Sequence, residues 1–208
     1  EFLMIFYFTG TGNSLYAASR IAEDQGDRIF SIAKLMDLKK DVYHYELEKD
    51  ELLGFVFPVF AWAPPKIVLD FAEKLEISTK PGTDGKSEDV GGKPYVFSLC
   101  TCGDEEGRTS EVLRKALAKR GLDLDGAFSL RMPNNYIIGF DVDSKEAAVG
   151  KLKAADLLLS EIGKAIGRRQ KGIDLTIPGK FPGLKTALIN PMFNRFAVST
   201  KSFHVDDT

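Results

Sequence analysis

Apolar runs of about five to ten residues alternate along this chain with stretches in which apolar residues recur every three or four positions. The continuous runs predict five buried strands, at 2–8, 28–32, 51–60, 94–100 and 126–132. The spaced positions predict helices within 15–22, 67–75, 112–117 and 148–166. Strands that alternate with helices are typical of a parallel sheet covered on both faces, so we expect an α/β fold.

Prolines, glycines and helix-capping residues indicate where the predicted helices and loops begin and end. Pro64 and Pro65 precede one helical stretch and suit its first turn, where a missing N–H costs nothing. Residues 78–93 are polar and rich in glycine, which predicts an exposed loop. Asp143 followed by Glu146 resembles a capping box, so we expect the longest helix of the chain to begin there.

The pattern changes after residue 170. Three prolines interrupt the remaining apolar positions, which predicts one or two short helices lying over the domain. Basic residues outnumber acidic ones here: Lys180, Lys185, Arg195 and Lys201 against Asp174, Asp206 and Asp207. We therefore expect one domain over 4–170 and a basic C-terminal extension over 171–208.

Composition narrows the possible functions. A net charge of −2 gives no global reason to expect nucleic acid as a partner. No apolar run approaches the roughly 18 residues of a membrane span, and Gly10 to Asn13 interrupt the apolar start of a possible signal peptide. These features fit a cytoplasmic protein. Cys100 and Cys102 are too few to ligate an iron–sulfur cluster, and we expect free thiols and no metal site.

The sequence "FTGTGNS" (8–14) joins the first strand to its helix. No lysine follows the glycines, so it is not a Walker loop, and Leu15 replaces the third glycine of the dinucleotide fingerprint. Hydroxyl and amide groups remain, and neutral donors at a helix start can bind a terminal phosphate such as that of a mononucleotide. The alternative is a turn with a hydroxyl N-cap and no ligand.

Four stretches carry a resemblance to a known family: "MIFYFTGTGNS", "FPVFAWAPP", "MPNNYI" and "FNRFAVSTKSFHVDDT". They resemble bacterial proteins in which a flavodoxin-like domain is fused to a ferredoxin domain. The resemblance implies a flavodoxin-like three-layer sandwich, with a five-stranded parallel sheet in the order 2-1-3-4-5 and FMN at its switch point. It also implies a ferredoxin-type partner with 4Fe-4S clusters, expected in cis beyond Thr208, where this chain stops. A natural stand-alone protein is the alternative.

The same resemblance implies three FMN-binding loops. Their residues are Thr9, Gly10, Thr11, Gly12, Asn13 and Ser14 for the phosphate; Pro58, Val59, Phe60, Ala61 and Trp62 for the ring; and Thr101, Cys102 and Gly103 for its pyrimidine edge. Trp62 or Phe60 is expected to stack on the ring. The acidic residues at 104–106 either lower the flavin's potential or lie in solvent. Asn134, Asn135 and Tyr136 are weaker candidates for contact with flavin or partner, and a plain turn explains them equally well. Cys100 fits a small buried residue.

Three functions compete. The first is an FMN-binding domain that passes electrons between FMN and the iron–sulfur clusters of a partner docked on the basic extension and the loops of the sheet's carboxyl edge. The alternative is an NAD(P)H-dependent FMN reductase acting on quinones or nitro compounds. A receiver-like signalling module is disfavoured, because it needs acidic residues where Thr9, Gly10 and Pro58 stand. In the first reading no side chain acts as acid, base or nucleophile, because the flavin supplies the chemistry.

Overall fold

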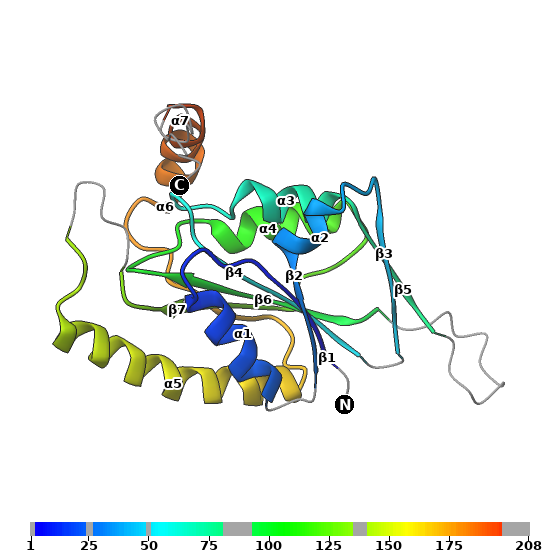
Figure 1. Ribbon diagram of the computed structural model, residues 1–208, viewed down its shortest axis with the longest axis horizontal. Coiled ribbons are helices and arrows are strands. Elements are labelled where there is room, and N and C mark those ends of the chain that lie inside the picture. Colours follow the sequence, from blue (N-terminus) through cyan, green and yellow to red (C-terminus); the bar gives the residue numbers. More distant parts are fainter. Residues whose placement is uncertain (1–2, 24–26, 49–50, 81–92, 135–140, 197–208) are drawn as a thin grey trace, which may run out of the picture.

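A parallel sheet lies between two layers of helices in the computed structural model (Figure 1), which describes residues 3–23, 27–48, 51–80, 93–134 and 141–196. Helices α2 (Ile32–Asp37), α3 (Lys66–Glu73) and α4 (Thr109–Ala118) cover one face. Helices α1 (Asn13–Glu23) and α5 (Lys145–Gly167) cover the other. The expected α/β class and parallel sheet are confirmed.

Within the described residues, six strands form the main sheet, in the order β2-β1-β4-β6-β7-β8. All neighbouring pairs are parallel. The strands are β1 (Leu3–Tyr7), β2 (Asp27–Ser31), β4 (Leu52–Pro58), β6 (Tyr95–Cys102), β7 (Gly126–Arg131) and β8 (Ile173–Leu175). Parallel strands end at one edge, so the loops after β1, β4 and β6 share the carboxyl edge of the sheet.

The expectation of a five-stranded sheet is wrong. The five expected segments are neighbours in the order β2-β1-β4-β6-β7, and β8 adds a sixth strand beside β7. A second sheet pairs β3 (Tyr43–Leu47) with β5 (Leu75–Thr79). These strands escape the apolar pattern because β8 is three residues long and largely exposed, and because only Tyr43 and Leu47 of β3 are buried.

Two apolar cores lie on opposite faces of the sheet. Several aromatic rings pack together on the face under α2, α3 and α4, where Phe6 lies 4.8 Å from Phe71 and 5.9 Å from Phe55 between ring centroids. Aliphatic side chains dominate the face under α1 and α5, among them Ile21 and Leu159. Burial of each such side chain contributes about 1.5–3 kcal/mol to folding. The strands that carry the candidate loops are therefore firmly held.

The long helix α5 begins one residue later than the capping pattern suggests. Its N-cap is Ser144, whose Oγ accepts a hydrogen bond from the N–H of Ala147. Asp143 instead accepts from the N–H of Asn134 and pairs with Lys151, so the expected box starting at Asp143 is wrong. Across the described residues, no helix combines the length and the apolarity that crossing a membrane requires.

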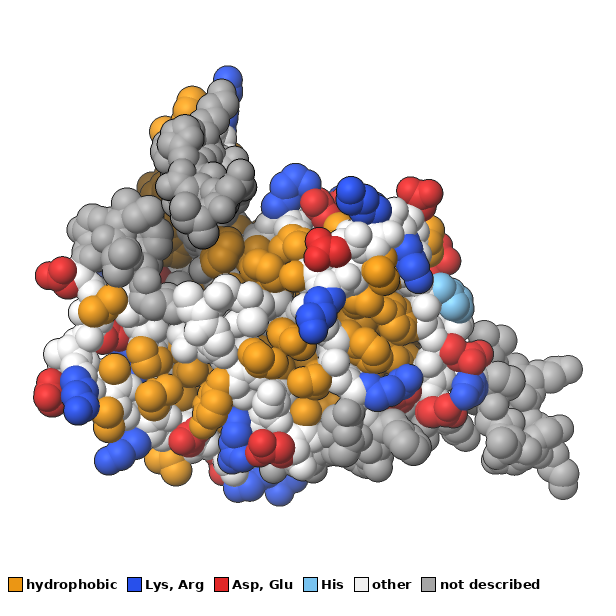
Figure 2. Space-filling model, in the orientation of Figure 1, with side chains coloured by type: hydrophobic (Ala, Val, Ile, Leu, Met, Phe, Trp, Pro, Cys, Tyr) orange, Lys and Arg blue, Asp and Glu red, His pale blue; other side chains and the backbone are white. Residues whose placement is uncertain are grey.

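Short helical segments follow β8, but the described residues form three of them instead of the expected one or two. They are α6 (Pro182–Leu184), a π-helical turn η1 (Lys185–Ile189) and α7 (Asn190–Phe196), and α7 stands out from the body in Figure 1. Large apolar side chains on these segments are exposed, including Phe181, Leu188 and Phe196, and orange patches mark this region in Figure 2. The division into 4–170 and 171–208 stays a prediction.

Candidate functional site

The turn between β1 and α1 opens onto free space. Gly12 has a φ of +100°, a conformation that L side chains rarely adopt, and its N–H donates to Thr9 Oγ1 at 3.1 Å. A Cβ added at Gly10 or at Gly12 would meet no atom within 4 Å. Because α1 begins at Asn13, the first N–H groups of the helix have no acceptor within the helix and suit an anion.

Two side chains of this turn reach the neighbouring strand ends. Ser14 is 1% exposed, and its Oγ lies 2.8 Å from Thr101 Oγ1 at the end of β6. Asn13 Nδ2 donates to the carbonyl of Pro133, which follows β7, at 3.2 Å. The side chains of Asn13 and Ser14 therefore fix the turn against the sheet, while Gly10 and Thr11 lie on the surface.

The loop after β4 contains a tight turn with an unusual backbone. The N–H groups of Phe60 and Ala63 each donate to the other residue's carbonyl, at 2.9 and 3.2 Å. Between them, Ala61 and Trp62 have φ values of 46° and 63°. This left-handed conformation costs a non-glycine residue about 1–2 kcal/mol. Such backbone strain persists where surrounding contacts hold it, and it often marks binding loops.

The two aromatic candidates in this turn differ in their surroundings. Phe60 is 43% exposed and meets Phe8 edge-on, with 6.1 Å between ring centroids. Trp62 is half-buried, its indole N–H donates to Glu105 Oε1 at 2.8 Å, and the ammonium of Lys185 lies 5.3 Å from its ring centroid. One side of the indole therefore already has a cation beside it, whereas Phe60 presents an open ring.

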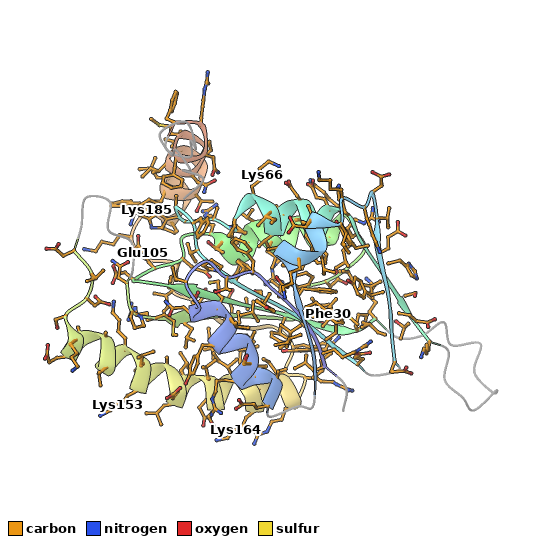
Figure 3. All side chains as sticks on the ribbon, viewed as in Figure 1. Phe30, Lys66, Glu105, Lys153, Lys164 and Lys185 are labelled. Carbon is orange, nitrogen blue, oxygen red and sulfur yellow. The ribbon has the colours of Figure 1, made fainter. Side chains whose placement is uncertain are left out.

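Glu105 links this turn to the chain's C-terminal part. Its carboxylate accepts hydrogen bonds from Trp62, from Lys185 and from the N–H of Lys180, and Figure 3 shows Glu105 and Lys185 approaching each other. Burial opposes ionisation of Glu105, but the hydrogen bonds from Lys185 and Trp62 outweigh it and lower its pKa. The carboxylate is therefore charged at neutral pH and paired with a cation.

The third loop starts at buried residues of β6. Thr101 and Cys102 are buried within that strand, and Gly103, which follows, is half-buried. Lys151 Nζ donates to the carbonyl of Gly103 at 3.2 Å and pairs with Asp143 at 2.8 Å. A cation of α5 thus stands beside the loop expected to meet the flavin edge.

Sequence reasoning missed the burial of Glu106. This carboxylate is 2% exposed, and its Oε2 accepts from Cys100 Sγ at 2.7 Å, from Ser110 at 3.0 Å and from Ser129 at 2.8 Å. Its backbone N–H also donates to the carbonyl of Ile177 at 2.7 Å. In the run Asp104-Glu105-Glu106, the neighbouring residues give no sign that Glu106 is buried while Asp104 is exposed.

Both cysteines are buried free thiols. Burial, and then the charge of Glu106, raise the pKa of Cys100 well above its ordinary value. Burial is also the main cause that raises the pKa of Cys102 to about 12. Neither thiol is a nucleophile at neutral pH. Among the described residues, no group of three or more His, Cys, Asp or Glu side chains is arranged to hold a metal.

Thr101 is the point at which the three candidate loops meet. Its hydroxyl contacts Ser14 of the first loop, and its carbonyl accepts from the N–H of Val59 in the second loop at 2.8 Å. Asn134 lies against Gly103, since a Cβ at Gly103 would be 3.4 Å from its side chain. Asn135 and Tyr136 lie outside the described residues.

No family model matches the chain, and no curated protein matches it either. In fold it is similar to a short-chain flavodoxin associated with a non-canonical PDU bacterial microcompartment, at 16% identity and a TM-score of 0.38, over 78% of this chain and 98% of that one. It is also similar to an NAD(P)H:quinone oxidoreductase from Methanothermobacter marburgensis, at 10% identity and a TM-score of 0.43, over 80% of this chain and 96% of that one. A third similar structure is that of an FMN-dependent NADH-azoreductase from Bacillus anthracis, at 8% identity and a TM-score of 0.39, over 78% of this chain and 99% of that one. Such low identities and TM-scores assign no function to this chain.

Proposed function

We propose that this chain is an FMN-binding electron-transfer domain with the flavodoxin-like arrangement of loops. The observation that carries the proposal is the meeting of the three loops at Thr101, on the carboxyl edge of a parallel sheet. That edge is where ligands bind in open α/β folds.

The residues of the first loop fit a phosphate. Gly10 and Gly12 leave open space beside a helix start, and no side-chain cation belongs to the turn. Backbone N–H groups of Thr11, Asn13 and Ser14 and the hydroxyl of Thr11 would hold the phosphate of FMN. Thr9 would act indirectly, because its Oγ1 accepts from Gly12 and shapes the turn.

The other two loops fit the flavin ring. The exposed ring of Phe60 offers a flat apolar wall, and Gly103 offers a backbone N–H at a residue that has no side chain of its own. Pro58, Val59, Ala61 and Trp62 would shape this wall, and Thr101 and Cys102 would support Gly103 from within β6. FMN would supply the redox chemistry, while these residues bind, orient and exclude water.

The proposed partner is a ferredoxin-type iron–sulfur domain. Exposed Leu184, Leu188 and Met192 of the C-terminal helices, together with Lys180 and Arg195, offer an apolar surface with basic residues near the loops. Such a patch favours contact with a protein of acidic surface. Rapid reduction of the flavin-loaded domain by a reduced 4Fe-4S ferredoxin in stopped-flow absorbance would support this partner class, and slow, salt-independent transfer would contradict it.

Titration of FMN with the purified protein tests the cofactor assignment. We expect quenched FMN fluorescence and bound-flavin absorbance near ~450 nm. Riboflavin, which lacks the phosphate, should bind more weakly. A protein that leaves FMN fluorescence unchanged would end the proposal.

A second assay separates the carrier from the NAD(P)H-dependent FMN reductase acting on quinones or nitro compounds. The flavin-loaded protein is mixed with NADH or NADPH and a quinone, and the nicotinamide absorbance is followed. A carrier should oxidise the nicotinamide slowly. Fast turnover would favour the reductase instead.

A further inference from the structure

We infer that Thr186 and Asn190 are positioning residues of the candidate site, and that they hold the 60–63 turn in the form that would face the flavin. The inference rests on the proposed function for its flavin readout. Both residues lie more than 120 positions along the chain from the turn that they contact.

The turn needs support from outside. Its two central residues, Ala61 and Trp62, both have left-handed backbones without being glycine. Backbone in sparsely populated regions persists only when its surroundings determine it. The two internal hydrogen bonds of the turn, between Phe60 and Ala63, close its ends. They leave the carbonyl of Trp62, and the second acceptor position of the Phe60 carbonyl, to other partners.

Those carbonyls are bonded by the C-terminal segment, defined here as residues 177–190. Thr186 Oγ1 donates to the carbonyl of Trp62 at 2.7 Å, and Asn190 Nδ2 donates to the carbonyl of Phe60 at 3.0 Å. A hydrogen bond to a carbonyl fixes the plane of its peptide group. The segment thereby orients the peptide planes on both sides of the Ala61–Trp62 pair.

Thr186 is itself held in place. Its hydroxyl oxygen accepts from the backbone N–H of Arg108 at 3.0 Å while its proton goes to Trp62. Gly107 packs beneath both residues, since a Cβ there would lie 2.7 Å from Trp62 Cβ and 2.8 Å from Thr186 Oγ1. Lys185 adds its ammonium beside the Trp62 ring. The C-terminal segment therefore belongs to the candidate site, in addition to its proposed contact with an iron–sulfur partner.

The test compares Thr186→Val, which keeps the shape and removes the hydroxyl, with Thr186→Ser, which retains the hydroxyl. Trp62 is the only tryptophan, so its fluorescence reports the turn directly. In protein without flavin, we expect Thr186→Val to shift Trp62 emission and raise its quenching by acrylamide, and Thr186→Ser to behave as the wild type.

Flavin binding supplies the second readout. Thr186→Val should weaken FMN and riboflavin binding by the same factor, about tenfold, because one hydrogen bond that orients the ring loop is lost while the phosphate turn is untouched. Asn190→Ala should act in the same direction. Ile189→Ala, which truncates an exposed side chain in the same segment, should change neither readout.

The outcomes distinguish the two proposals. If wild-type protein binds no flavin, the proposed function fails, and Trp62 emission alone decides whether Thr186 holds the turn. If wild-type protein binds FMN but Thr186→Val and Asn190→Ala match it in both readouts, the inference is overturned. A loss in Thr186→Val that Thr186→Ser fails to restore would also overturn it, because the hydroxyl would then not be responsible.

Discussion

The hydroxyls of Ser14 and Thr101 lie 2.8 Å apart in the interior, although 87 positions separate the two residues in the chain. This contact joins the start of α1 to the end of β6, the two places where a phosphate and a flavin edge are expected. Since a hydroxyl can donate and accept at once, Ser14 can bind Thr101 and retain capacity for a ligand. The pair therefore divides the turn into a buried support and an exposed binding rim at Gly10 and Thr11.

Thr11→Ala should weaken FMN binding by about 1.5–3 kcal/mol, because a hydroxyl that donates to a charged phosphate is lost. Riboflavin affinity should not change, because riboflavin has no phosphate. Fluorescence titrations with both ligands measure the difference, and Ser160→Ala on the exposed side of α5 is the control. An equal loss for both flavins would contradict a phosphate contact at Thr11.

Gly107→Ala should disturb Trp62, whereas Gly121→Ala should not. Both glycines have positive φ values, +67° and +74°, so both substitutions carry similar backbone strain of about 1–2 kcal/mol. Only at Gly107 would the new methyl group meet other atoms within 4 Å, among them those of Trp62. We expect a larger fall in unfolding free energy and a shifted Trp62 emission for Gly107→Ala. Matching results for the two variants would refute the packing at Gly107.

Glu106→Gln should reduce the free energy of unfolding by roughly 1–3 kcal/mol, because a neutral amide oxygen is a weaker acceptor than a carboxylate oxygen for the three buried donors. Asp104→Asn makes the same chemical change at an exposed position and should stay within about 0.5 kcal/mol of the wild type. Urea denaturation followed by circular dichroism measures both. Equal stabilities would mean that Glu106 does not bind its three donors as a carboxylate.

The contact between Glu105 and Lys185 should weaken in acid. The pKa of Glu105 is lower in the folded protein than the usual value of about 4.3, so its stabilising effect is complete at neutral pH and is lost as the pH falls through the folded value. We expect Trp62 emission to be constant from about pH 8 to pH 5 and to change below about pH 4. In Glu105→Gln this transition should disappear. A transition that persists in that variant would have to arise from another group.

The sequence predicts those parts of the site that are formed by residues close together in the chain. The glycines and hydroxyls of residues 9–14 mark the β1–α1 turn, and apolar runs locate five of the six strands that the described residues form in the main sheet. The contacts of Thr186 and Asn190 with the 60–63 turn escape such reasoning, because they join segments more than 120 positions apart. The burial of Glu106 escapes it as well, since only the fold brings Ser110 and Ser129 to its carboxylate.

The two backbone hydrogen bonds of Ile177 limit how far this domain can be shortened before it is fused to another protein. Its carbonyl accepts from the N–H of Glu106, and its own N–H donates to Ser129 Oγ at 3.2 Å, immediately after edge strand β8. A fragment that ends at residue 170 would lose β8, and it would also lose the hydrogen bonds that Ile177 makes with Glu106 and Ser129. A fragment for grafting should therefore end downstream of Asn190, even if the rest of α7 is removed.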